Sequence, residues 1–142
     1  MKLFNHNSTM FMVICMFFAG FASTMNMWVD KLSDIRFSMN DVYMVGLMKG
    51  WMIFFMGLWY SYTKGAIYGG IIVLVFYFAI RYQVFVSEKD YLNGMIPHHS
   101  MAIHMSKRLK EKENSIQPLL DSIINGQEQE IEFMKQRLAS KS

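Results

Sequence analysis

One short stretch of the chain gathers the side chains best suited to binding a metal ion. Residues 95–105 hold three of the four histidines and three of the 15 methionines, namely Met95, His98, His99, Met101, His104 and Met105. Imidazole and thioether groups together favour a soft or borderline ion, and Cu(I) over Zn(II), Mg(II) or Ca(II). A methionine-rich helix face is also ordinary core material, so packing is the alternative interpretation.

The spacing of these residues predicts where they point if the stretch is helical. At 100° per residue, Met95, His98 and Met105 share one side of a helix. His99 projects from the adjacent apolar side, which we expect to be buried, and His104 points nearly opposite to it. Neighbouring histidines face about 100° apart, so a second helix is needed to complete one site.

The remaining composition narrows the chemistry. Cys15 is the only cysteine, which excludes an intrachain disulfide and cysteine-based zinc or iron–sulfur sites. No nucleophile–base pair, phosphate loop or cofactor fingerprint is visible, so we do not predict an enzyme. A metal-assisted activity that uses Glu130 and a nearby histidine is the enzymatic alternative.

Charge divides the chain into two parts. Residues 1–86 carry six Lys/Arg and three Asp/Glu, whereas residues 87–142 carry eight of each. The net charge of +3 therefore belongs to the apolar part, which favours contact with lipid headgroups over nucleic acid. We predict a transmembrane domain over residues 1–86 and a water-soluble domain over residues 87–142.

Three apolar segments in the first part have the length that a bilayer requires, at about residues 9–28, 41–60 and 66–82. A cleaved export signal that begins at Lys2 is the alternative for the first segment. Gly65, Gly69 and Gly70 would allow close helix approach.

The second segment carries two unusual features. Met44, Met48, Met52 and Met56 form a stripe, which either packs between helices or resembles the pore helix of copper-uptake channels. Lys49 lies beside this stripe, and an intramembrane lysine is a functional candidate by default. Snorkelling of Lys49 to the membrane surface and cation–π contact with Trp51 or Trp59 are the structural alternatives.

The pattern of residues 87–142 predicts a helical hairpin. Ser87 and Asp90 match a capping box, and we expect helices over residues 88–113 and 116–139, with Ser115 as the second N-cap. The second helix carries an apolar seam with heptad spacing, which includes Gln127: Leu120, Ile124, Gln127, Ile131, Met134 and Leu138. Two helices bury little core, so we expect a homo-oligomer formed through residues 87–142, such as a four-helix bundle.

At this point the sequence resembles a known family. The run Asp90–His99, with its M-I-P-H-H core, is similar to the signature of the domain-of-unknown-function 305 family. Gln127, Glu130 and Met134 match its second element in order and spacing. The resemblance covers about residues 88–138 and does not include the apolar segments.

The family resemblance implies a ferritin-like helical bundle, and some members are implicated in periplasmic copper binding. It implies metal ligands at Met95, His98, His99, Met105 and Met134, supported by Gln127 and Glu130. Met101 and His104 stand outside the signature. Many members carry two copies of the motif, whereas this chain carries one, which agrees with assembly from two chains.

The sequence as a whole predicts an all-α protein with three transmembrane helices followed by a two-helix hairpin. We expect a membrane-anchored Cu(I)-binding protein for storage, buffering or hand-off, or alternatively a membrane scaffold whose histidines only pack. The positive-inside count favours a cytoplasmic C-terminal domain. A His/Met site without cysteine suits an oxidising compartment, so we expect a plasma (inner) membrane protein whose hairpin faces the periplasm or cell exterior.

Overall fold

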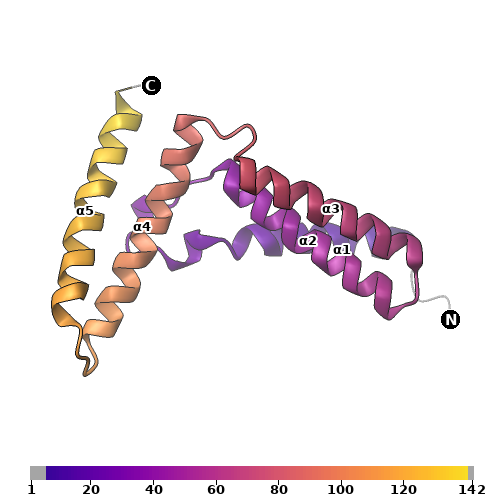
Figure 1. Ribbon diagram of the computed structural model, residues 1–142, viewed down its shortest axis with the longest axis horizontal. Coiled ribbons are helices and arrows are strands. Elements are labelled where there is room, and N and C mark those ends of the chain that lie inside the picture. The colour runs from indigo at the N-terminus through magenta and orange to yellow at the C-terminus, as the bar shows by residue number, and fades with distance from the viewer. Residues whose placement is uncertain (1–5, 141–142) are drawn as a thin grey trace. The chain divides into compact units, whose positions relative to one another are not determined.

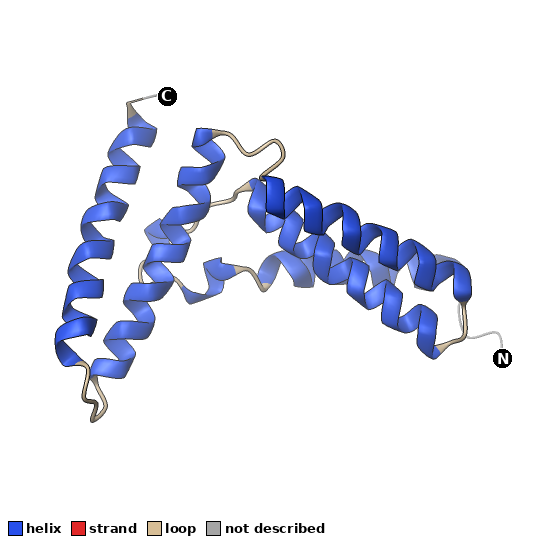
Figure 2. Ribbon diagram, viewed as in Figure 1, coloured by secondary structure: helices blue, strands red, loops and turns tan. Residues whose placement is uncertain are grey.

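The structure, a computed structural model, describes the backbone of residues 6–140, without the side chains of residues 6–10, 12 and 13. Within that range the chain forms five α-helices and two short 3₁₀ helices and no strand (Figures 1 and 2). The all-α prediction is confirmed. The chain divides into two compact units, one formed by residues up to 24 and 40–85, the other by residues 25–39 and 86–142.

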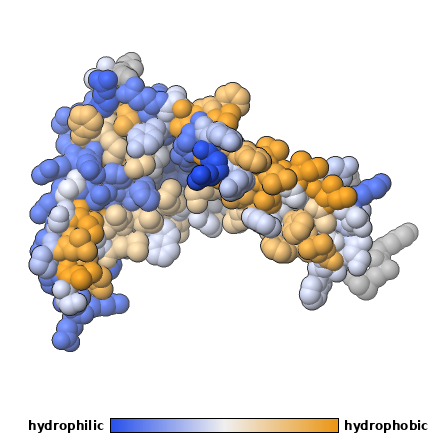
Figure 3. Space-filling view, in the orientation of Figure 1, coloured by the Kyte–Doolittle hydropathy of each residue, from blue (hydrophilic) through white to orange (hydrophobic). Residues whose placement is uncertain are grey.

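The first unit contains α1 (His6–Ala22), α2 (Met39–Trp59) and α3 (Thr63–Tyr82). By length and composition, α2 and α3 are long and apolar enough to cross a membrane, and apolar residues gather over them in Figure 3. The expected continuation of the first segment to Trp28 is wrong, because α1 ends at Ala22. Lys2, which the cleaved-signal alternative uses, lies outside the described residues.

Glycines hold α2 and α3 close together. A Cβ atom on Gly57 would lie 2.3 Å from the backbone nitrogen of Ala66, and one on Gly69 would lie 2.3 Å from the backbone nitrogen of Phe54. A Cβ atom on Gly70 would meet only the Phe54 ring, at 3.7 Å. The two backbones therefore approach each other at Gly57 and Gly69, as small residues permit in apolar helix pairs.

The side chain of Lys49 is buried within the first unit. It is 8% exposed, and its Nζ atom lies 5.4 Å from the centre of the Phe17 ring on α1. The cation–π partner is thus Phe17, and not Trp51 or Trp59 as the sequence suggested. In the methionine stripe, Met44, Met48 and Met52 are each at least two-fifths exposed, so they lie on the outer face of this unit.

The second unit is built on an antiparallel pair of helices, α4 (Glu88–Lys110) and α5 (Gln117–Ala139). The predicted capping box is confirmed, because Ser87 Oγ accepts from the Asp90 amide and the Asp90 carboxylate accepts from the Ser87 amide. The prediction of Ser115 as the second N-cap is wrong. Ile116 occupies that position, and its amide donates to the Asn114 side chain at 3.2 Å.

A small apolar core joins the two helices. Its buried members are Leu92, Ile96, Ile103, Ile131 and Met134, flanked by Met95, Ile124 and Leu138. The heptad seam of α5 thus packs within one chain, where Leu120 and Ile131 are 4% and 7% exposed. Assembly of a four-helix bundle from two copies stays a prediction.

The rest of the second unit comes from residues 25–39, which we call the cover segment. It contains two 3₁₀ helices, η1 (Met25–Trp28) and η2 (Leu32–Asp34), which both contact α4. The Asn26 side chain closes the segment by bonding the backbone N–H and carbonyl of Arg36 at 3.0 and 2.8 Å. The end of the first expected apolar segment and the residues that follow it are therefore part of the hairpin's packing.

Candidate metal-binding site

Helix α4 carries the predicted ligand cluster. The helix runs through Pro97 without ending, and Pro97 itself is fully buried. His98 and His99 follow directly, with ring centres 6.0 Å apart and ring planes inclined by 63°. The two imidazole rings therefore point into different surroundings, as helical spacing predicts for adjacent residues.

The ring of His98 contacts the cover segment. Its Nδ1 atom lies 3.4 Å from the Sδ atom of Met25, the first residue of η1. The His98 side chain is exposed and Met25 is half-buried. Two soft donors from distant parts of the sequence thus meet at the surface of the second unit, and the sequence alone did not single out Met25.

The ring of His99 has a different environment. Its side chain is 13% exposed, and its Nδ1 atom lies 2.9 Å from Glu130 Oε2 on α5. The carboxylate is close but not aligned with the ring N–H, so this buried nitrogen has no hydrogen-bond partner among the described residues. Burial lowers the pKa of His99 below its ordinary value of 6.5, although the Glu130 carboxylate acts in the opposite direction. The imidazole is consequently neutral at pH 7 and keeps a lone pair for a metal.

The other predicted ligands lie in different environments. Met134 is 6% exposed within the core, and Met95 packs against that core. Met105 and His104 line a groove of about 490 Å³ beside Trp28, while Met101 and Gln127 are half-buried. Among the described residues, no three His, Cys, Asp or Glu side chains converge as a metal-binding group. The pairs that the structure assembles are His98–Met25 and His99–Glu130.

Polar contacts fasten the cover segment beneath this cluster. Ser100, which is fully buried, donates from Oγ to Asp34 Oδ2 at 2.7 Å and accepts from the Asp30 amide at 2.9 Å. Lys135 of α5 reaches Asp34 Oδ1 at 2.5 Å, and Lys107 reaches Asp30 Oδ2 at 2.8 Å. One aspartate of the segment therefore joins both helices of the hairpin.

The carboxyl group of Asp34 stays charged in this setting. Its side chain is 2% exposed, and burial alone would raise its pKa. The hydrogen bonds from Lys135 and Ser100, with the charges of Lys135 and Lys31, outweigh burial and hold the pKa below 3.8. The sequence offered one clue to this contact, because Ser100 stands on the core-facing stripe between Ile96 and Ile103, where a polar residue needs a partner.

Comparisons with known proteins place the second unit in context. Residues 80–138 match the family model described as Domain of unknown function (DUF305). Over 137 residues the chain is 45% identical to the "Uncharacterized protein L153" of Acanthamoeba polyphaga mimivirus, which covers 92% of this chain and 90% of that protein. No solved structure matches the chain.

Proposed function

Because the chain belongs to the DUF305 family, whose domain it carries over residues 80–138, we propose that it is a membrane-anchored protein that binds a soft metal ion, Cu(I), for storage, buffering or hand-off. The observation that carries the proposal is the 3.4 Å approach of His98 Nδ1 to Met25 Sδ. An imidazole and a thioether are the donor types that select Cu(I) over harder ions.

The separation of these two donors fits a shared ion. Metal–nitrogen and metal–sulfur bonds of about 2.0 and 2.3 Å allow two donors on one ion to lie at most about 4.3 Å apart. The Nδ1–Sδ distance is shorter than this limit, so neither segment has to move far to share an ion. His99, whose ring is neutral at pH 7, is the next residue along the helix and offers Nε2 as a further donor, because its Nδ1 faces the Glu130 carboxylate.

The role of the surrounding residues follows from their contacts. Asp34 and Asp30 fasten the cover segment to α4 and α5, and the same segment carries Met25. The cover segment therefore positions the thioether against His98. Met134 sits in the core and is a packing residue in this arrangement, which supports the scaffold alternative for that position.

Membrane anchoring is the second part of the proposal. Large apolar side chains of α2 and α3 are widely exposed, among them Trp51, Phe55, Trp59, Ile67 and Ile71. Soluble monomers seldom expose so much contiguous apolar surface, whereas lipid tails would cover it. With α2 and α3 in a plasma (inner) membrane, the metal-binding unit faces the side away from the cytoplasm, where thioethers persist and thiols oxidise.

A competition titration with a Cu(I) chelator on the full chain in neutral detergent tests the metal site. We expect a sub-micromolar site that His98→Ala or Met25→Leu weakens about tenfold or more, since each removes one donor. Met27→Leu is the matched control, because Met27 lies in the same 3₁₀ helix and is 71% exposed. Equal titrations for Met25→Leu and Met27→Leu would contradict the site, and protein that binds no Cu(I) would favour the scaffold.

A further inference from the structure

The second unit contains another cavity, which is lined by cationic and apolar side chains. It has a volume of about 360 Å³ and lies among the cover segment, the start of α4 and the end of α5. Its lining consists of Arg36, Glu88, Lys89, Leu92, Asn93, Lys135, Leu138 and Ala139. Three cationic side chains from three different segments thus surround one small cavity, together with one carboxylate.

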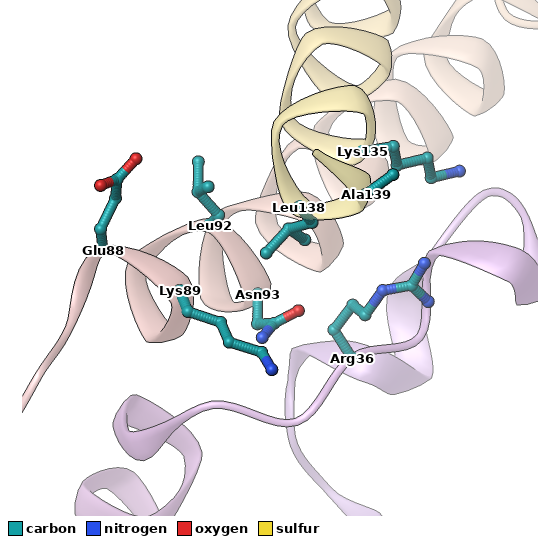
Figure 4. A pocket seen from close by; sticks show the side chains of 8 residues that line it. All are labelled: Arg36, Glu88, Lys89, Leu92, Asn93, Lys135, Leu138 and Ala139. Atoms are coloured by element: carbon teal, nitrogen blue, oxygen red, sulfur yellow. The ribbon is translucent and has the colours of Figure 1, made fainter. Parts of the chain in front are cut away.

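Some charged side chains of this cavity have an oppositely charged partner and others do not. Lys135 is paired with Asp34, and Glu88 contacts Arg137 at 3.5 Å. No carboxylate lies within ion-pair distance of Arg36 or Lys89 among the described residues. Figure 4 shows Lys89 and Asn93 extending from α4 on the side of Arg36, while the Glu88 carboxylate is directed away. Arg36 and Lys89 are therefore the two cations of the cavity without a carboxylate partner among the described residues.

The cationic groups retain donors for a ligand. Arg36 spends one nitrogen, Nη1, on the carbonyls of Ser33 and Ile35 at 2.9 and 2.8 Å, which fixes the direction of the guanidinium plane. Its Nη2 and Nε donors remain, and a guanidinium fork matches a phosphate geometrically. Lys89 adds an ammonium group and Asn93 an amide, so the polar side of the cavity suits an oxyanion.

The opposite side of the cavity is apolar. Leu92, Leu138 and Ala139 line it, which a bare phosphate would leave unused. A glycerol ester beside the phosphate would cover these carbons and gain hydrophobic energy. The lining therefore matches the headgroup end of an anionic phospholipid better than inorganic phosphate.

The covalent chain limits how far two lining residues can lie from the ends of the proposed spans. Arg36 stands three residues before the first residue of α2, and Lys89 seven residues after the last residue of α3. Extended chain covers at most about 3.6 Å per residue, so the Cα atoms of Arg36 and Lys89 lie within about 11 and 25 Å of the first residue of α2 and the last residue of α3. Both residues can therefore lie at the bilayer surface when α2 and α3 span the membrane.

We propose that this cavity binds the phosphate of an anionic phospholipid, held by Arg36 and Lys89 with the apolar floor under the glycerol. The choice of a lipid as phosphate source rests on the membrane anchoring proposed above, whereas the phosphate site itself does not. Anionic lipid in the surrounding leaflet would then hold the second unit at the membrane surface.

Calorimetric titration of the full chain in neutral detergent tests this site with three probes: short-chain phosphatidic acid, short-chain phosphatidylcholine and inorganic phosphate. We expect phosphatidic acid to bind tightest. The Arg36→Gln/Lys89→Gln variant should bind it about 30-fold more weakly, since each cation near an anionic lipid contributes about 1 kcal/mol and 1.4 kcal/mol is tenfold. Arg108→Gln/Lys112→Gln, an equal charge change in the last turn of α4 and just after it, should leave binding unchanged.

Each other outcome overturns a defined part of the proposal. Equal losses in the two double variants would mean general charge attraction and no site. Equal affinity for inorganic phosphate and phosphatidic acid would keep the phosphate site and refute the lipid. Arg36 also holds the cover segment, so Lys89→Gln alone serves as the second variant, and unchanged binding in that folded protein refutes the site. Cu(I) titration of the same variants stays unaffected, which separates this site from the metal site.

Discussion

Replacing Asp34 by asparagine should loosen the cover segment and destabilise the second unit. The substitution keeps the shape of the side chain and an acceptor for Ser100, but it leaves the Lys135 ammonium without its partner. Removing one member of a buried ion pair costs about 3–5 kcal/mol. The Lys135 side chain is 28% exposed and can rehydrate, so we expect a smaller loss of about 2 kcal/mol for Asp34→Asn. Asp34→Ala also removes the Ser100 bond and should cost about 3 kcal/mol.

Two measurements on the full chain in detergent test this loss of stability: a thermal melt and, separately, hydrogen exchange of the backbone amides. We expect Asp34→Asn to lower the midpoint of the second unit by about 10 °C and to speed exchange across the cover segment. The control is Asp121→Asn, because Asp121 pairs with Lys110 but is 54% exposed and should cost less than about 1 kcal/mol. If the two variants unfold alike, or if exchange in the segment is unchanged, Asp34 does not fasten it.

Lowering the pH should also weaken the contact between Asp34 and Lys135. The pKa of Asp34 is held below 3.8 in the fold, so the unfolded chain takes up this proton first as acid is added. The stabilisation is complete above that value and is lost as the pH falls through the lower pKa of the folded state. Asp34→Asn should therefore flatten the acid limb of the unfolding midpoint measured against pH.

Three other predictions concern His99, the glycine contacts and the topology. Burial keeps the pKa of His99 below 6.5, so stability should decline as the pH falls below 6.5, and His99→Gln should remove that decline in a series of melts. Gly69→Ala should destabilise the α2–α3 pair because its Cβ atom meets the Phe54 backbone, whereas Gly70→Ala should be neutral; equal melting of the two would refute the close approach. An exported phosphatase fused after Ser142 should be active, and a fluorescent protein that matures only in the cytoplasm should be dark there; the reverse pair of results would place the second unit in the cytoplasm.

The extent of the family domain differs from the extent of the structural unit. The family match covers residues 80–138, but the compact unit also takes in residues 25–39. A fragment of the hairpin alone would expose buried Ser100 and lose the partner of Lys135. We therefore expect the two proposed ligands, Met25 and His98, to act together only in the full chain.

Local pattern determined much of this protein. Long apolar runs give helices, which is why α2 and α3 appear close to their predicted limits. A capping box is a contact between residues three apart, so Ser87 and Asp90 located the start of α4 without knowledge of the fold. Helical periodicity likewise placed His99 on the apolar side of its helix, where it is 13% exposed.

Tertiary structure decided what meets across long sequence separations. Met25 and His98 are 73 residues apart, and Asp34 and Lys135 are 101 residues apart. No periodicity links such residues, because their approach depends on how a loop packs on two helices. The sequence showed Ser100 as a polar residue on an apolar stripe, yet only the fold supplied its partner. In the same way, the sequence grouped Met134 with the ligands, and the fold placed it in the core. One helix face serves equally well for packing and for binding, and the packing of its neighbours decides which role each side chain takes.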